Sequence, residues 1–141
     1  MTNHDDTRTT VTALLGRIAA GDDDGIAALF AEQIDWRLDW PAQGHSALPW
    51  IRPRATRADA VEHFRELRAH HVPEKDASTV ERILVDGADA VVLATIAQTV
   101  LATGQPYTAA CALHLTVEDG QITRYHVYED SLSVARAFGE Q

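Results

Sequence analysis

Cysteine is almost absent from this sequence, since Cys111 is the only one in 141 residues. No internal disulfide can form, and there is no cysteine cluster to hold a metal. Basic residues are also few: 12 stand against 21 acidic ones, which gives a formal net charge of -9. A chain with this net negative charge lacks the excess of basic residues expected of a protein that binds nucleic acid or an anionic membrane.

Long hydrophobic runs are missing as well. No apolar stretch approaches the roughly 20 residues of a membrane-spanning helix. The N-terminal MTNHDDTRTT does not show the charged-then-apolar pattern of a signal peptide. We therefore expect a cytoplasmic protein, and the abundance of Ala and Arg is typical of a GC-rich bacterial genome. No glycine-rich phosphate loop and no metal-ligand spacing of histidines is present, so we expect no cofactor and no metal.

The apolar content is sufficient for one folded domain. At 45% hydrophobic residues, the chain 1–141 can bury a core without a disulfide or a metal. Residues 1–7 are expected to be a flexible tail, with order beginning near Arg8. Helical spacing of apolar residues predicts helices over 11–18, 26–30 and 60–67. The second follows a cap at 22–24, and Thr56 with Asp59 resembles a capping box before the third.

Strand signals follow the first two helices and then fill the second half of the chain. Alternation over 34–40 predicts a half-buried strand, and a long loop over 41–55 carries His45 and Trp50. Turn signals at 86–87, 103–104 and 119–120 then separate four strands, and Asp130 can cap a short segment over 132–138. The order α-α-β-α-β-β-β-β predicts an α+β fold, in which three N-terminal helices cover a curved, cone-shaped antiparallel sheet and a central pocket.

The last hairpins can be paired residue by residue. A turn at Asp119-Gly120 places His114 opposite Tyr125, with Glu129 two positions farther along the same face. A hairpin near Gly104 adds Thr95 beside His114. The predicted pocket face is then Thr95, Ala97, Thr99, Ala110, Ala112, His114, Tyr125, Val127 and Glu129. Small side chains beneath helices leave the space that a ligand needs, and the apolar opposite face predicts a homodimer.

Three stretches resemble a known superfamily. AAGDDDGIAALFAEQIDWRLDWP at 19–41 is similar to the opening of ketosteroid isomerases, and EDGQITRYHVYEDS at 118–131 is similar to their closing hairpin. LPWIRPRATRADAVEHFREL at 48–67 resembles bacterial SnoaL-like proteins. The chain is thus identified as a member of the nuclear transport factor two-like superfamily, of the SnoaL-like and ketosteroid isomerase-like kind. The resemblance implies a conical pocket and dimerisation through the outer sheet face.

The sequence departs from the catalytic sets of that superfamily. The Asp-Arg-Asp set of limonene epoxide hydrolases matches Ala97, Thr99 and Val127 here. The Tyr and Asp of the ketosteroid isomerase oxyanion hole match Leu14 and Ala112. The position of the isomerase base falls on Leu38, or on Asp39 after a shift of one residue. The resemblance therefore predicts the fold and leaves the reaction open.

The strongest candidates for chemistry are His114, Tyr125, Glu129 and Asp39. Histidine suits acid–base work near neutral pH, which makes His114 a candidate, and Tyr125 can donate to a developing oxyanion, while Glu129 or Asp39 could be the second acid–base group. The alternative is a histidine satisfied by its neighbours, a carboxylate at the pocket rim and a solvated Asp39. Trp36, Trp40 and Trp50 are candidate walls for a flat ligand, or ordinary core residues.

These residues suit a cofactor-independent isomerase, polyketide cyclase or dehydratase that acts on a small apolar cyclic metabolite of polyketide or terpenoid type. Two alternatives stay open. One is a non-catalytic small-molecule-binding module, and the other is an epoxide hydrolase or epoxide-opening cyclase that uses Glu129 with Tyr125. Turnover that fails in Glu129→Gln and survives in His114→Ala would favour the epoxide reaction.

Overall fold

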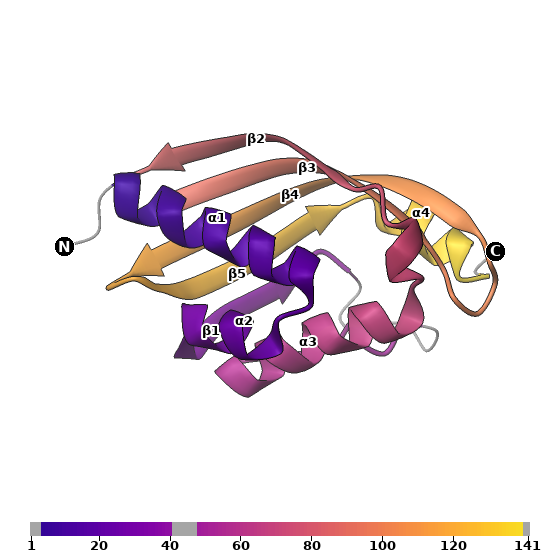
Figure 1. Cartoon of the computed structure of the whole chain (residues 1–141), viewed down its shortest axis with the longest axis horizontal. Coiled ribbons are helices and arrows are strands. Elements are labelled where there is room, and N and C mark those ends of the chain that lie inside the picture. The colour runs from indigo at the N-terminus through magenta and orange to yellow at the C-terminus, as the bar shows by residue number, and fades with distance from the viewer. Residues whose placement is uncertain (1–3, 41–47, 140–141) are drawn as a thin grey trace.

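The computed structural model describes residues 4–40 and 48–139 of the chain. Helices α1, α2 and α3 lie on one side of a curved sheet, and α4 lies at one end of it (Figure 1). The elements are α1 (His4–Ala20), α2 (Asp23–Leu29), β1 (Phe30–Leu38), α3 (Arg57–His70), η1 (Pro73–Lys75), β2 (Thr79–Asp86), β3 (Asp89–Thr99), β4 (Pro106–Glu118), β5 (Gln121–Glu129) and α4 (Ser131–Ala137). The predicted α+β class and element order are confirmed.

The helices begin where side chains can satisfy free backbone N–H groups. Asp22 accepts a hydrogen bond from the N–H of Gly25 at the start of α2. Thr56 and Asp59 form the predicted capping box of α3, each accepting from the backbone of the other. No helix of the described part of the chain is long and apolar enough to span a bilayer.

Helix α1 begins earlier than the sequence predicted. It includes residues from His4 onward, whereas a flexible tail was expected up to residue 7. Thr7 is fully buried, and its hydroxyl donates a 2.7 Å hydrogen bond to the carbonyl of Gly87 in the turn between β2 and β3. This contact across the sheet edge orders a polar segment that has no helical periodicity of its own.

In the described residues, five strands form one sheet in the order β1-β5-β4-β3-β2. β2 to β5 form an antiparallel meander, as predicted, whereas β1 pairs with β5 in parallel. The sheet is therefore mixed rather than wholly antiparallel. This pairing brings Trp36 of β1 beside Tyr125 of β5, although 89 positions separate them in the sequence.

The predicted register of the last hairpin is wrong by one residue beyond a β-bulge. At the turn, where Asp119 and Gly120 have positive φ, Glu118 pairs with Gln121 as expected. The register then shifts, so that Val117 pairs with Ile122 but Thr116 pairs with Arg124. Because neighbouring side chains on a strand point to opposite faces, this one extra residue turns the rest of β5 over relative to β4.

The β3–β4 register also differs, but without changing the faces. Thr99 pairs with Pro106, and Thr95 pairs with Ala110 rather than lying beside His114. The connection is longer than a tight turn at Gly104, because the N–H of Val100 donates to the carbonyl of Gln105. The shift involves an even number of residues, so the predicted neighbours on each of these two strands keep a common face.

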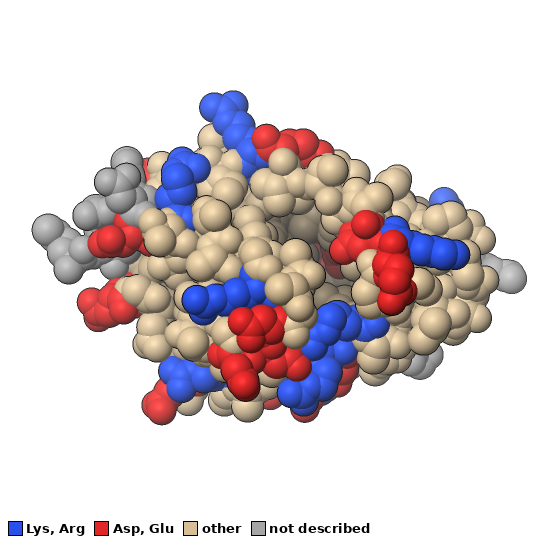
Figure 2. Space-filling view, in the orientation of Figure 1, with Lys and Arg blue, Asp and Glu red and all other residues tan. Residues whose placement is uncertain are grey.

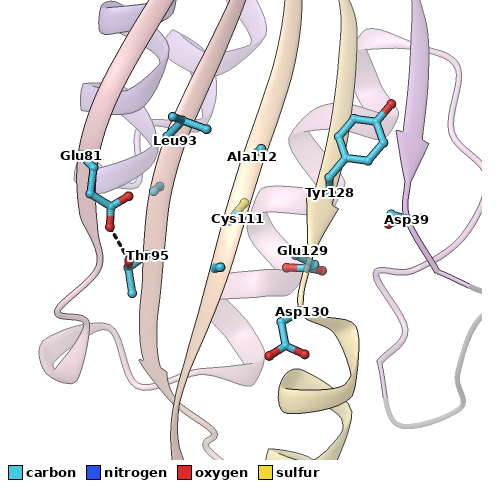
Figure 3. A pocket seen from close by; sticks show the side chains of 11 residues that line it. Asp39, Glu81, Leu93, Thr95, Cys111, Ala112, Tyr128, Glu129 and Asp130 are labelled. Atoms are coloured by element: carbon cyan, nitrogen blue, oxygen red, sulfur yellow. Dashed lines mark hydrogen bonds between the residues drawn. The ribbon is translucent and has the colours of Figure 1, made fainter.

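The two faces of the sheet have different surroundings. The inner face, beneath the helices, carries Val92, Leu113, Leu115, Tyr125 and Val127, which are buried with Phe30 and Phe64. The outer face carries His114, Ala112 and Thr95, and no described helix covers it (Figure 3). The residues predicted to share the face under the helices therefore lie on both sides of the sheet: some are on the inner face and the others are on the outer face.

Candidate active site

Half-buried side chains gather on the inner face at the end of the sheet nearest α4. Although the helices cover this face, several side chains there are not fully buried, among them Leu38, Trp40, Ala94, Ile96, Tyr107 and Glu129. At the other end of the same face, Ala90, Val92 and Leu115 are fully buried. Figure 2 shows a hollow in the middle of the helix-covered side of the molecule. We use the name inner pocket for the region of the inner face around these half-buried side chains.

Glu129, the last residue of β5, places a carboxyl group in the inner pocket. Its Oε1 accepts a 2.7 Å hydrogen bond from the indole Nε1 of Trp40. Burial raises the pKa of Glu129, the Trp40 hydrogen bond partly opposes this, and the nearby charges of Asp130 and Asp39 raise the pKa further. The protonated form is therefore favoured more than in an ordinary surface glutamate.

Two further protic groups lie near this carboxyl. Cys111 pairs directly with Glu129 across β4 and β5, and burial together with that carboxylate raises the pKa of the thiol to about 12. Tyr125 lies four residues before Glu129 on β5, and its pKa is raised by burial and by the charges of Cys111 and Glu129. Tyr125 and Glu129 share the inner face, as the sequence predicted, because the bulge precedes both.

A second polar group borders the pocket on β4. The phenol oxygen of Tyr107 lies 2.8 Å from Nε2 of His71 and 3.0 Å from Oε1 of Gln98. His71 ends α3, and its Nδ1 lies 2.7 Å from the carbonyl oxygen of Leu67. Burial lowers the pKa of His71, and burial with the charges of Glu129 and Asp76 raises the pKa of Tyr107. Both groups are therefore neutral near pH 7.

An aromatic cluster closes the deep side of the pocket. Trp36 stacks on Tyr125 at a ring separation of 4.7 Å, and the imidazole of His63 packs edge-on against Trp36, also at 4.7 Å. Burial lowers the pKa of His63 to about 3, helped by the nearby Arg54 cation. Nδ1 of His63 and Nε1 of Trp36 have no hydrogen-bond partner among the described residues. Trp36 is thus packed against the hydrophobic core, as the alternative of an ordinary core residue predicted.

His114 does not lie in this pocket. It is on the outer face, opposite His126 rather than Tyr125, because of the bulge in β5. Its Nε2 lies 3.0 Å from Oδ1 of Asp89, which also accepts a 2.7 Å hydrogen bond from Thr116. These contacts, Thr116 first, lower the pKa of Asp89. The predicted pair of His114 with Tyr125 is therefore not formed, and the structure supports the alternative of a histidine satisfied by a neighbour.

An open hollow of about 540 Å³ lies on the outer face (Figure 3), and its lining includes Ala94 and Glu129. Leu93, Thr95, Ala112 and Tyr128 contribute to it, and so does Asp39. Further residues that line it are Glu81, Ala94, Ala110, Cys111, Glu129 and Asp130. Thr95 and Ala112, predicted to line the central pocket, thus line the outer hollow instead. Asp39 lies one residue from Trp40 and near enough to Glu129 to affect its pKa.

The other predicted lining residues are distributed between the core and the sheet end. Val127 is buried on the inner face, and Thr99 is buried at the end of β3. Ala97 is half-buried on β3 beside Ser78, whose hydroxyl accepts from its N–H. Trp50 is buried against His70, His71 and Phe138 rather than free to stack on a ligand. His45 lies outside the described residues.

Sequence reasoning missed Tyr107, Gln98 and His71 as a group. His71 is the C-cap of α3, and its ring turns inward to the sheet. One signal was available: Tyr107 shares the odd-numbered positions of β4 with Cys111, Leu113 and Leu115, and so the inner face. In the described part of the chain, no three His, Cys, Asp or Glu side chains are arranged to hold a metal ion.

The comparisons agree with this geometry. The family model described as a SnoaL-like domain matches residues 11–125. No curated protein matches the sequence. An NTF2-like protein from Burkholderia xenovorans superposes with a TM-score of 0.80 at 18% identity, over 99% of this chain and 100% of that one.

Two further solved structures carry names that mention a reaction. A protein provisionally named an isomerase, from Bacillus subtilis, superposes with a TM-score of 0.78 at 18% identity, over 100% of this chain and 98% of that one. A protein provisionally named a ketosteroid isomerase, from Kribbella flavida, has a TM-score of 0.66 at 23% identity, over 92% of this chain and 81% of that one. At these identities the likeness establishes the fold.

Proposed function

Because the chain belongs to the SnoaL-like family, we propose that it is an acid–base enzyme of the isomerase, cyclase or dehydratase type, in which Glu129 transfers the proton. The observation that carries this proposal is the half-buried carboxyl of Glu129, which accepts a hydrogen bond from Trp40 and has a pKa raised by burial. The names of two structural neighbours are consistent with an isomerase-type role.

A raised carboxyl pKa is useful for proton transfer at neutral pH. A general acid or base is most effective when its pKa lies near the working pH, and burial moves Glu129 in that direction. Once ionised, a partly desolvated carboxylate is also a stronger base than one in water. The Trp40 N–H binds one carboxyl oxygen, and among the described residues no hydrogen bond occupies Oε2, which can therefore act on a substrate.

The surroundings of the carboxyl support a small apolar substrate. Leu38 and Ile96 pack against both hydrophobic clusters of the protein and stay half-buried in the inner pocket. Trp40 adds an aromatic wall beside the reacting group. We therefore propose a small cyclic metabolite of polyketide or terpenoid type as the substrate, transformed by side chains of the protein without a cofactor.

A generic probe can test the role of Glu129 before the natural substrate is known. Nitrobenzisoxazole loses its ring C–H proton to a base while its N–O bond breaks, and the electron pair ends on a coloured phenolate oxygen. We expect the purified protein to accelerate this reaction, with a rate that rises as Glu129 ionises. Glu129→Gln should lose at least about 100-fold in rate, the lower end of what a positioned base contributes.

The matched control is Asp39→Asn, because Asp39 lies next to Trp40 but has an exposed side chain, whereas Glu129 is half-buried and accepts the Trp40 hydrogen bond. It should keep the rate within about threefold. If Glu129→Gln reacts as fast as the wild-type protein, the acid–base proposal is wrong. If the wild-type protein binds the probe and accelerates nothing, the chain is a small-molecule-binding module instead.

We also propose that the protein forms a homodimer through the outer sheet face. Leu84, Leu93 and Tyr128 lie on this face with 42%, 37% and 42% of their surface exposed, which is unusual for large apolar side chains so close together. Leu93→Glu should convert a dimer to a monomer in analytical ultracentrifugation. Leu132→Glu on α4, also at an exposed leucine, should not. A monomeric wild-type protein would contradict this proposal.

A further inference from the structure

The tautomer of His71 follows from its two hydrogen bonds. Its Nδ1 lies 2.7 Å from the carbonyl oxygen of Leu67, and a carbonyl can only accept, so Nδ1 carries a proton. His71 is buried with 4% of its surface exposed, which disfavours a second proton on the ring. The remaining nitrogen, Nε2, is therefore an acceptor.

This tautomer determines where the phenol proton of Tyr107 goes. Tyr107 has one hydrogen and two neighbours, Nε2 of His71 at 2.8 Å and the Gln98 amide at 3.0 Å. If the hydrogen pointed to Gln98, the lone pairs of the phenol oxygen and of Nε2 would face each other. The hydrogen therefore points to His71, and Gln98 meets the phenol with its N–H₂ end, since the two ends of an amide exchange by a half-turn.

Tyr107 consequently has no hydrogen left to donate to a ligand and can only accept. A phenol oxygen has two acceptor sites, of which Gln98 uses one. The side chain is half-buried on the same face of the sheet as Glu129. No group in 4–40 or 48–139 donates to the second lone pair, so a ligand can use it, provided that the ligand offers a donor such as a hydroxyl.

Glu129 has the complementary preference. Its Oε1 already accepts from Trp40, so in the protonated acid Oε1 is the carbonyl oxygen and Oε2 carries the hydrogen. The free hydrogen-bonding function of the acid is then a donor. A ligand that satisfies both groups must offer a hydroxyl to Tyr107 and a carbonyl or similar oxygen to Glu129.

We infer that the inner pocket selects cyclic ligands that carry both a hydroxyl and a carbonyl group, with Tyr107 as the acceptor for the hydroxyl and His71 as the residue that holds Tyr107 in that role. This inference deepens the proposed function and rests on it for the part played by Glu129. The hydroxyl contact itself depends only on Tyr107, His71 and Gln98.

Matched ring compounds test the selection. We would measure Kd by calorimetry for indanone, which has a carbonyl alone, and for hydroxyindanone, which adds a hydroxyl to the same ring. The wild-type protein should bind hydroxyindanone at least about fivefold more tightly, as expected for one hydrogen bond. Tyr107→Phe should bind the two compounds about equally, while its Kd for indanone stays the same as that of the wild-type protein. The control Tyr128→Phe, on the outer face, should keep the preference.

Equal binding of the two compounds by the wild-type protein, no binding of hydroxyindanone, or a preference that survives in Tyr107→Phe would each overturn the inference. Nitrogen NMR of the wild-type protein is a second test that needs no variant and no ligand. It should show His71 protonated at Nδ1 and unprotonated at Nε2 near pH 7, and the opposite tautomer or a doubly protonated ring would also overturn it.

The two proposals can fail separately. A protein that prefers hydroxyindanone but does not accelerate the nitrobenzisoxazole reaction would retain the binding selectivity and lose the enzymatic role. A protein that accelerates the reaction through Glu129 but ignores the hydroxyl would retain the enzymatic role and lose the selectivity.

Discussion

The indole Nε1 of Trp40 donates a 2.7 Å hydrogen bond to Oε1 of Glu129, joining the residues that follow β1 to the end of β5. The bond depends on the parallel pairing of these two strands, which places Leu38 beside Val127. It orients the carboxyl group in the inner pocket and moderates the pKa increase that burial causes. Trp40 is therefore both a wall of the pocket and a regulator of the proposed catalytic group.

Removing the indole N–H should move the pH dependence of activity. In Trp40→Phe, the pKa of Glu129 should rise further, because a hydrogen bond that favours the carboxylate is lost. The midpoint of the nitrobenzisoxazole rate profile should then shift to higher pH. Trp36→Phe is the matched control, since the Trp36 N–H has no partner among the described residues. A midpoint that shifts equally in both variants would contradict the assigned role of Trp40.

Glu129 should also make stability depend on pH in a defined direction. A carboxyl whose pKa is raised on folding binds its proton more tightly in the folded state, so its contribution is present at low pH and is lost as pH rises through the folded pKa. Glu129→Gln cannot ionise, and should be more stable than the wild-type protein at about pH 9. Each unit of pKa increase corresponds to about 1.4 kcal/mol. Urea unfolding at several pH values measures this difference, which should vanish toward about pH 4.

His63 should produce the opposite trend. Its folded pKa is about 3, below the ordinary value of 6.5, so the unfolded chain binds a proton that the folded protein does not. Its contribution is complete above about pH 6.5 and is lost as pH falls toward about 3, with about 2 kcal/mol lost by about pH 5. Unfolding experiments on His63→Phe should show a shallower loss of stability between about pH 7 and about pH 5. Parallel curves for the two proteins would show that His63 is protonated normally.

His114 should not affect catalysis, because it lies on the outer face and contacts Asp89. We expect His114→Ala to keep the nitrobenzisoxazole rate within about threefold of the wild-type value. The pKa of Asp89 should rise toward its ordinary value, since the contact with His114 helps to lower it. Carbon NMR of the carboxyl groups can follow that change. A loss of rate comparable to that of Glu129→Gln would place His114 in the reaction after all.

The fold was largely predictable because local signals are strong. The Asp22 cap, the Thr56–Asp59 capping box and the turn at Asp119-Gly120 all occur where the sequence placed them. These features depend on a few neighbouring residues, and they recur whenever the same side chains meet free backbone groups. The length of α1 was not predictable in the same way, because Thr7 is ordered by a contact with Gly87, which is 80 residues away.

The site was predicted less well than the fold. One residue accounts for much of the disagreement between the predicted and the observed site. Thr123 is the extra residue of the bulge in β5, and it separates His114 from Tyr125 and Glu129 by turning them to opposite faces. No feature of the sequence around Thr123 distinguishes a bulge from continuous alternation. Glu129 and Tyr125 were expected on one face and are found there, because the bulge lies before both.

The sequence by itself determined the helices, the turns and the alternation of β4, since these depend on backbone capping and on side-chain period over a few residues. The tertiary structure decided which face the helices cover, which strand lies beside β5 and where the ring of His71 points. These outcomes depend on contacts between distant segments, such as Trp40 with Glu129 and His71 with Tyr107. A local pattern specifies a face of an element, and packing alone decides what that face meets.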